Sequence, residues 1–262
     1  MRRAAAGLLA ALMITSGASG INPEARAADG PNFLAEVGRA VVSAAVGESR
    51  DRPEIVNDEI GGTHVSGGGQ SHADVMVEFV PCEYRAVVDL VLAGTAKTKT
   101  VGVSGRVRVL TNGATQFSGR KRVTADAERI ETQPASVRVR LDTELAGVGT
   151  PFTGPLNRLV SGFAARSFYR EQDENNREAA QLTERSITEE FDRDASRQIA
   201  DADRVYREQR AELRRRGLWP QELRLSTTTD DVRVRGRLAS DPLPFSSLPL
   251  PPWGGGDKRP PP

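Results

Sequence analysis

The feature that most constrains the fold is the segment Arg166–Arg216, in which 25 of 51 residues are charged and neither proline nor glycine occurs. Apolar residues recur in it about every 3.7 positions, which is nearer a straight helix than the 3.5 spacing of a heptad coiled coil. These residues are Ile187, Phe191, Ala195, Ile199, Ala202, Tyr206 and Leu213, and the series covers 26 residues in about seven steps because one step between Tyr206 and Leu213 has no member. The spacing predicts one long charged helix over 155–217.

The order of charges also favours a helix. Nine acids and three bases occupy 171–194, and four acids and seven bases occupy 195–216, which complements the helix dipole. Acids precede bases by four residues at Asp173 and Arg177, Glu189 and Arg193, Asp203 and Arg207, and Glu212 and Arg216. Gly217 and then Pro220 end the helix, and Asn175-Asn176 is the predicted place for a break.

Before the helix, 71–150 alternates apolar and polar residues with a period of two, as a sheet with one buried face requires. The strands follow one another without intervening helices, so the sheet is predicted to be mainly antiparallel. Asn112-Gly113 predicts a type I′ hairpin turn. After the helix, 218–240 returns to alternation and is expected to rejoin the same sheet.

The flanking segments complete the predicted organisation. Residues 28–70 are predicted to form an N-terminal helix over Asn32–Val46 and a Gly-rich loop. Residues 241–262 hold eight prolines and predict a disordered tail, in which Leu248–Trp253 has the composition of a polyproline-II ligand. The predicted fold is therefore α+β: a mainly antiparallel sheet of about 5–7 strands, an N-terminal helix, and a long charged helix inserted before the last strand.

Residues 1–27 have the pattern of an export signal. Arg2 and Arg3 precede the apolar run Ala4–Ile14, and Ala25-Arg26-Ala27 offers a cleavage site, with a second at Ala18-Ser19-Gly20. The apolar run is shorter than the roughly 20 residues that span a bilayer, and no later segment is long enough. We therefore predict an exported protein, periplasmic, on the cell surface or extracellular, without a transmembrane segment in its mature chain.

Charge leaves the partner open. Without residues 1–27 the chain has 33 basic and 34 acidic residues, a balance of −1, so global charge indicates no polyanionic partner. Seven arginines nevertheless fall on the polar faces of predicted strands: Arg106, Arg108, Arg138, Arg140, Arg233, Arg235 and Arg237. This arginine face could bind an anionic envelope component, or it could meet the acidic half of the helix, 171–194, which the near-zero net charge favours. No aromatic residues interleave with the arginines, so no nucleic acid is expected.

Candidate chemistry is sparse. His64 and His72 are candidate metal ligands with Asp74, but their spacing matches no known site and no second cluster completes one, so no metal or other cofactor is predicted. Cys82 is the only cysteine, which excludes an intramolecular disulfide, and with either histidine it could form a nucleophile and base. The sequence contains no G-x-S-x-G elbow and no phosphate-binding loop. No catalytic residue is assigned.

These observations lead to a functional expectation and two alternatives. We expect an exported, non-catalytic binding or scaffolding protein. The first alternative is a carrier of a lipid or other amphiphile held between sheet and helix, and the second is a hydrolase. The long polar helix could pair with a partner protein, as in a coiled coil, or lie on its own sheet, and the sequence leaves both open.

Overall fold

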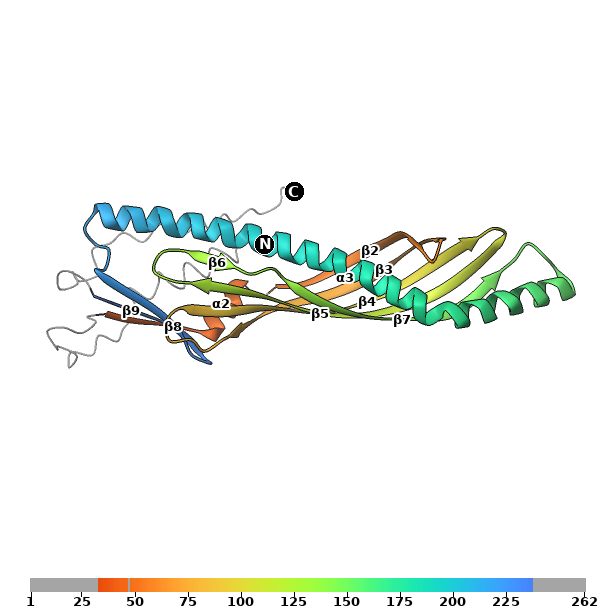
Figure 1. The fold of residues 1–262 in the computed structure, drawn as a ribbon, viewed down its shortest axis with the longest axis horizontal. Helices are drawn as coiled ribbons and strands as arrows, with labels where there is room; N and C mark the ends of the chain where they lie inside the picture. Colours follow the sequence, from red (N-terminus) through yellow and green to blue (C-terminus); the bar gives the residue numbers. More distant parts are fainter. Residues whose placement is uncertain (1–32, 47, 238–262) are drawn as a thin grey trace, which may run out of the picture.

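The computed structural model describes residues 33–46 and 48–237, and it confirms an α+β protein built mainly from antiparallel strands (Figure 1). The predicted signal peptide over 1–27 and the predicted tail over 241–262, with Leu248–Trp253, lie outside the described residues. The described elements are β1 (Phe33–Gly38), α2 (Arg39–Val46), β2 (Glu48–Ile60), β3 (Thr63–Phe79), β4 (Ala86–Ser104), β5 (Val107–Ala125), β6 (Ile130–Thr132), β7 (Ser136–Gly149), α3 (Gly154–Arg215), β8 (Glu222–Thr227) and β9 (Asp231–Arg237).

The larger of two sheets has the order β2-β3-β4-β5-β6, and β7 also pairs with β5. Every pairing is antiparallel, as the uninterrupted succession of strands predicts. The sheet has an inner face, which is turned toward α3, and an outer face on the opposite side. Buried positions alternate along β5, where Thr115, Lys121, Val123 and Ala125 lie on the inner face, as one buried face demands.

The Gly-rich loop predicted within 28–70 is wrong, because most of it forms the β2–β3 hairpin. Gly61 and Gly62 have φ of 55° and 69° and form its turn, a conformation that glycine adopts without steric cost. Gly67 and Gly69 lie inside β3 instead. A Cβ on either would lie 2.1 Å from a carbonyl oxygen of β4, so these glycines permit close approach of two backbones.

The hairpin turn predicted at Asn112-Gly113 is also wrong. Both residues lie in the middle of β5, which pairs with β4 on one side and β7 on the other. The β4–β5 turn is at Gly105, with φ of 59°, and Arg106. Gly113 leaves room for the side chain of Thr98 on β4, because a Cβ at position 113 would lie 2.5 Å from Oγ1 of Thr98.

The two ends of the described chain form a second sheet of order β1-β9-β8. The described part of the segment 218–240 therefore does not rejoin the large sheet: β9 pairs with β1 and β8, and an isolated bridge joins Cys82 to Thr227. The helix predicted over Asn32–Val46 is wrong in its first half, where β1 pairs with β9, and is confirmed for α2. Pairing with β9 outweighs the helical spacing of that segment.

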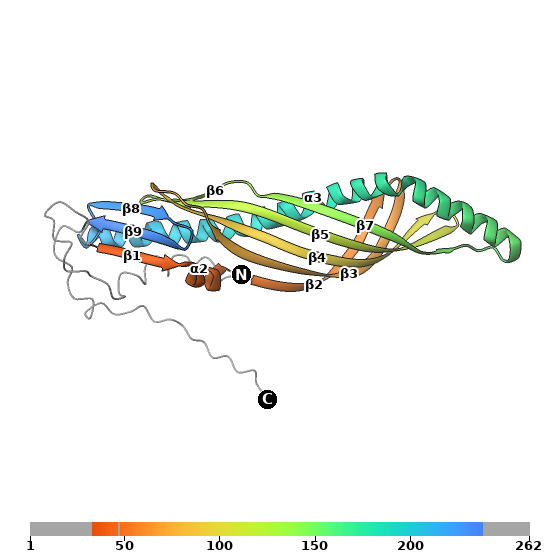
Figure 2. The ribbon, with the colours of Figure 1, turned by 90° about the horizontal axis from the view of Figure 1, so that it is seen from below.

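The long helix α3 is confirmed, and it runs along most of the length of the molecule (Figure 1, Figure 2). Its 62 residues correspond to about 93 Å at 1.5 Å per residue. Asn175-Asn176 does not break it, because Asn176 accepts a hydrogen bond from the Thr143 hydroxyl of β7 and Asn175 lies against Gly61. The helix lies on its own sheet rather than standing free.

The end of α3 follows the sequence closely. Leu218 N donates to Leu213 O and Gly217 N donates to Arg214 O, with Gly217 at φ of 69°, which is a Schellman motif. The predicted pairs Asp203–Arg207 and Glu212–Arg216 form at 2.7 and 2.6 Å.

The hydrophobic core lies where the second half of α3 meets both sheets. Ala195, Ala202 and Tyr206 of α3 pack there with buried residues of the large sheet and of the small sheet. The main contributors are Val77, Phe79, Val88, Leu90 and Val123 from the large sheet, and Ala35, Val37, Leu225, Val232 and Val234 from the small one. Small aliphatic side chains fill this core, with Tyr206 and Trp219 stacked edge to face at 6.3 Å between ring centroids.

Candidate ligand-binding groove on the outer face

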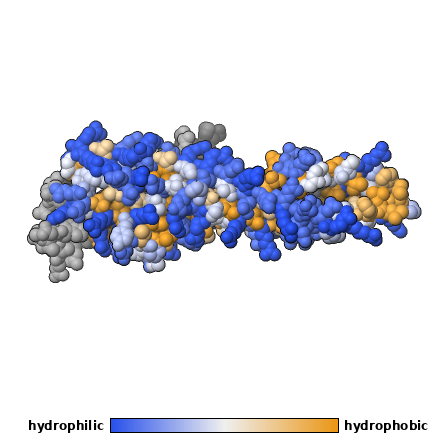
Figure 3. Space-filling model, in the orientation of Figure 1, coloured by the Kyte–Doolittle hydropathy of each residue, from blue (hydrophilic) through white to orange (hydrophobic). Residues whose placement is uncertain are grey.

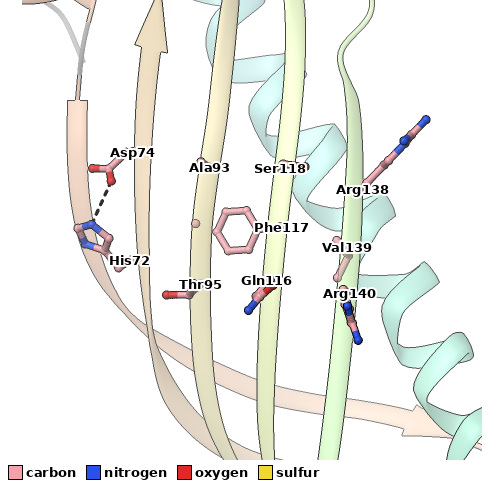
Figure 4. A pocket seen from close by; sticks show the side chains of 11 residues that line it. His72, Asp74, Ala93, Thr95, Gln116, Phe117, Ser118, Arg138, Val139 and Arg140 are labelled. Carbon is pink, nitrogen blue, oxygen red and sulfur yellow. Dashed lines mark hydrogen bonds and ion pairs between the residues drawn. The ribbon is translucent and has the colours of Figure 1, made fainter.

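An open groove of about 560 Å³ crosses β3, β4, β5 and β7 (Figure 4). Strand register builds it from two rows of side chains, because directly paired residues of antiparallel strands share one face. One row is His72, Thr95, Gln116 and Arg140, and the other is Asp74, Ala93, Ser118 and Arg138. Gly94, Phe117 and Val139 are paired with one another in register between the rows.

His72 stands at the β3 end of the groove between two carboxylates. Its Nδ1 lies 2.9 Å from Oδ1 of Asp51, its neighbour on β2, and its Nε2 lies 3.2 Å from Oδ2 of Asp74. The hydrogen bond to Asp51, followed by the charge of Asp74, raises the pKa of His72 above its ordinary value. Both ring nitrogens face acceptors, so the geometry favours the imidazolium ion and leaves no ring nitrogen to act as a base.

We predict that His72 titrates above its ordinary pKa of 6.5 and that Asp51→Asn with Asp74→Asn lowers its midpoint. Because the folded-state pKa is raised, the stabilisation from protonated His72 is present below pH 6.5 and is lost as pH rises through the folded pKa. NMR titration of the imidazole protons measures the midpoint. Asp58→Asn, on the same strand as Asp51, is the control, and an unchanged midpoint in the double variant would contradict the prediction.

Arg138 and Arg140 occupy the β7 end of the groove. Both are exposed, and within residues 33–46 and 48–237 their side chains form no hydrogen bond or ion pair. Thr95, Gln116 and Ser118 lie between them and His72, and Figure 4 shows the two arginines and the histidine at opposite ends of the rows. The groove can therefore offer two guanidinium groups, two hydroxyls and an amide to a ligand.

The seven arginines predicted to share one face do not do so. Arg233, Arg235 and Arg237 belong to the small sheet, and Arg233 pairs with Glu36 and Asp231 at 3.0 Å. Arg106 and Arg108 lie at the β4–β5 hairpin. Along β5, Arg108 is eight residues from Gln116, which lines the groove. Of the seven, Arg138 and Arg140 line the groove.

The predicted internal pairing of the arginine face with the acidic half of α3 is also wrong in its residues. In the part of the chain that the structure describes, the helix carboxylates contact other cations of the large sheet. Glu190 pairs with Arg52 of β2 at 2.6 Å, and Asp192 pairs with Lys121 of β5 at 2.6 Å. Lys121 and Arg52 lie on the inner face, where α3 packs, whereas Arg138 and Arg140 lie on the outer face.

A buried carboxylate on the outer face was not predicted. The side chain of Asp89 is fully covered, and it accepts hydrogen bonds from Arg122 at 2.8 and 3.0 Å and from Arg120 at 2.9 Å. Arg122 first, and then Arg120, lower the pKa of Asp89, although burial opposes the shift. Arg120 also reaches Glu78 at 2.7 Å. Since every charge in this network has a partner, we assign it to stability rather than to ligand binding.

Of the candidate metal ligands, His72 and Asp74 are in contact, but the two histidines are not brought together. His64 and His72 lie on one strand eight residues apart, about 26 Å at 3.3 Å per residue. Within the described residues, no three of His, Cys, Asp or Glu are grouped so that they could hold a metal ion.

Cys82 is also far from both histidines, because β3 runs seven residues, about 23 Å, from His72 to Phe79 before the chain reaches it. Backbone hydrogen bonding at Tyr84 lowers the pKa of the Cys82 thiol. Its backbone pairs with that of Thr227, N to O at 2.8 Å in both directions. No histidine is therefore in reach to act as its base.

Comparison with known proteins does not assign this chain to a family. No protein-family model matches the chain, and no match was found among curated proteins or among solved structures. Among the described helices, none contains an apolar window long enough to cross a membrane.

Proposed function

We propose that this is an exported, non-catalytic binding protein whose ligand is an anionic polysaccharide held in the outer groove. The proposal rests on the exposed guanidinium groups of Arg138 and Arg140, which have no side-chain partner among residues 33–46 and 48–237. Each can bind a carboxylate or sulfate in a planar, two-point geometry. Export rests on the signal pattern of residues 1–27.

The shape and lining of the groove favour a polymer of sugars. The groove crosses four strands and is open to solvent, so a chain can lie along it and extend past both ends. Thr95, Ser118 and Gln116 suit sugar hydroxyls. His72 at the far end is paired with Asp51 and Asp74 and adds no net positive charge, so the acidic groups of the ligand would bind at the β7 end.

The two alternatives from the sequence gain no support. For a lipid carrier, the helix residues Ala195, Ala202 and Tyr206 pack directly on core residues of the sheets. For a hydrolase, the ring nitrogens of His72 are both occupied by carboxylates, and Cys82 lies far along the chain from it.

The test is binding of polygalacturonate, with neutral dextran as the uncharged probe, measured by isothermal titration calorimetry. We expect Arg138→Gln with Arg140→Gln to weaken binding at least about tenfold, and added salt to weaken binding by the wild type. Arg185→Gln with Arg193→Gln removes two exposed arginines of α3 and serves as the matched control. Equal affinity of the groove variant and the control, or no binding of the polyanion by the wild type, would overturn the proposal.

A further inference from the structure

The first turns of α3 carry an apolar surface that faces solvent. Leu156, Leu159 and Phe163 are 51%, 71% and 73% exposed. Their spacing of three and four residues places them on one face of the helix. Figure 3 shows this apolar patch at the right-hand end of the molecule, where Figure 1 places the start of α3. We call Leu156, Leu159 and Phe163 the apolar tip.

The helix is held so that the apolar tip faces outward. Asn157, on the opposite side of the first turns, accepts a hydrogen bond from the Thr150 hydroxyl at 2.6 Å. Gly154, at φ of 66°, and Pro155 set the direction in which the helix leaves the β7–α3 connection. The exposed face is thus fixed by contacts to the chain before it.

The surroundings of the apolar tip are basic. Between Glu144 and Glu171 the sequence contains no Asp or Glu, while Arg158 and Arg166 are exposed within or next to the same turns of the helix. Arg106 and Arg108 are exposed on the β4–β5 hairpin at the same end of the sheet, where Arg108 pairs in register with Gly149 just before the helix. Within the described residues, none of these four arginines has a side-chain partner.

We propose that this end of the molecule docks on a membrane surface that contains anionic lipids. Leu156, Leu159 and Phe163 would enter the boundary between headgroups and acyl chains, and Arg158 and Arg166 would contact lipid phosphates. A helix with an apolar face and arginines on its polar surface is the pattern that lies in a membrane interface, and anionic headgroups supply the complementary charge. An apolar patch on the surface of a protein often marks an interaction site.

The shape of the molecule permits this docking. In both Figure 1 and Figure 2 the start of α3 projects past the ends of the strands at one end of the long axis. A flat surface can therefore approach the tip without meeting the sheet first. The groove with Arg138 and Arg140 lies on the outer face of the sheet, so the two proposed sites are separate.

The test is sedimentation of the full chain with vesicles of phosphatidylcholine, with and without 30% phosphatidylglycerol. We expect binding to the anionic vesicles, and at least about tenfold weaker binding by Leu159→Gln with Phe163→Gln. Arg158→Gln with Arg166→Gln should reduce binding to the anionic vesicles selectively. Because all samples keep the same residues 1–32, any binding by those residues is common to them and cancels in the comparison.

The matched control is Ile55→Gln with Tyr84→Gln, which removes two apolar side chains that are 88% and 87% exposed elsewhere on the molecule. The proposal is overturned if the wild type does not bind the anionic vesicles, or if the control loses as much binding as the tip variant. It is also overturned if light scattering shows that the tip variant changes the oligomeric mass while vesicle binding is unaltered, because the tip would then contact a second copy. Arg138→Gln with Arg140→Gln should bind vesicles normally, which separates this proposal from that of the groove.

Discussion

Asp192→Ala is expected to lower the free energy of unfolding by about 3 kcal/mol, because it leaves the ammonium group of Lys121 buried without a counter-charge. The side chain of Lys121 is only 1% exposed, and its Nζ donates to Oδ1 of Asp192 at 2.6 Å and to the Gln133 carbonyl at 2.9 Å. Asp192 also accepts a hydrogen bond from Ala135 N at 2.7 Å. We take the lower end of the range for a broken buried pair because Asp192 is 38% exposed.

Urea unfolding followed by circular dichroism measures this change. Lys121→Met with Asp192→Ala should return to within about 1 kcal/mol of the wild type, because an apolar side chain of similar length then occupies the site. Asp173→Ala, which removes an exposed carboxylate of the same helix, should stay within about 0.5 kcal/mol. Equal losses for Asp173→Ala and Asp192→Ala would contradict the assigned role of the pair.

Gly67→Ala and Gly69→Ala are each expected to destabilise the protein by about 3 kcal/mol, the upper end for overpacking a closely packed site. A Cβ at Gly67 would lie 2.1 Å from the Lys99 carbonyl oxygen, and one at Gly69 would lie 2.1 Å from that of Lys97. Backbone atoms cannot rotate away as a side chain can, so the strands would have to separate. Figure 2 shows β2 and β3 curving toward α3 at this end, where Glu178 accepts a hydrogen bond from Gly61 N at 3.0 Å.

The destabilisation by Gly67→Ala or Gly69→Ala can be measured as a decrease in the midpoint temperature of thermal unfolding. Gly147→Ala is the matched control, because a Cβ at that position of β7 meets nothing within 4 Å. Hydrogen exchange should show that the amides of the β3–β4 pairing around Gly67 and Gly69 lose protection first in these variants. A midpoint shift no larger than that of Gly147→Ala would show that the close approach does not limit this sheet.

The sequence predicted a helix or strand correctly where the residues within that one element carry the signal. The long helix followed from the absence of proline and glycine in Arg166–Arg216 together with the order of its charges, and Gly217 ended it as predicted. Alternation over 71–150 predicted strands because each strand must turn every second residue toward the core, and the absence of helices between them predicted antiparallel pairing.

The predictions of turns and loops were wrong where glycine has a different structural role from the one assumed. Glycine permits both a turn and a close approach of two strands, so Asn112-Gly113 was predicted as a turn although Gly113 lies in a strand. The Gly-rich segment before Gln70 was predicted as a loop for the same reason, although Gly67 and Gly69 are strand residues. Only the neighbouring strand distinguishes these uses, and it is distant in the sequence.

The candidate site was predictable in part. Arg138 and Arg140 were singled out by their alternation, and His72 as a rare residue, but their assembly into one groove depends on register across four strands. Asp51 was not singled out, because nothing near it in the sequence marks it as the partner of His72. The apolar tip had a sequence signal, the acid-free interval between Glu144 and Glu171, but its exposure could not be read from it.

The sequence by itself determined the α+β class, the antiparallel strands and the long helix, because propensity, period and charge order act over a few residues. The tertiary structure decided which strands form a second sheet, which face of the large sheet α3 covers, and which charges pair. Thus the acidic half of Arg166–Arg216 was correctly expected to meet cations of the sheet, yet those cations are Lys121 and Arg52. The reason is that face and register set the partners of a charge, and both depend on contacts between residues far apart in the chain.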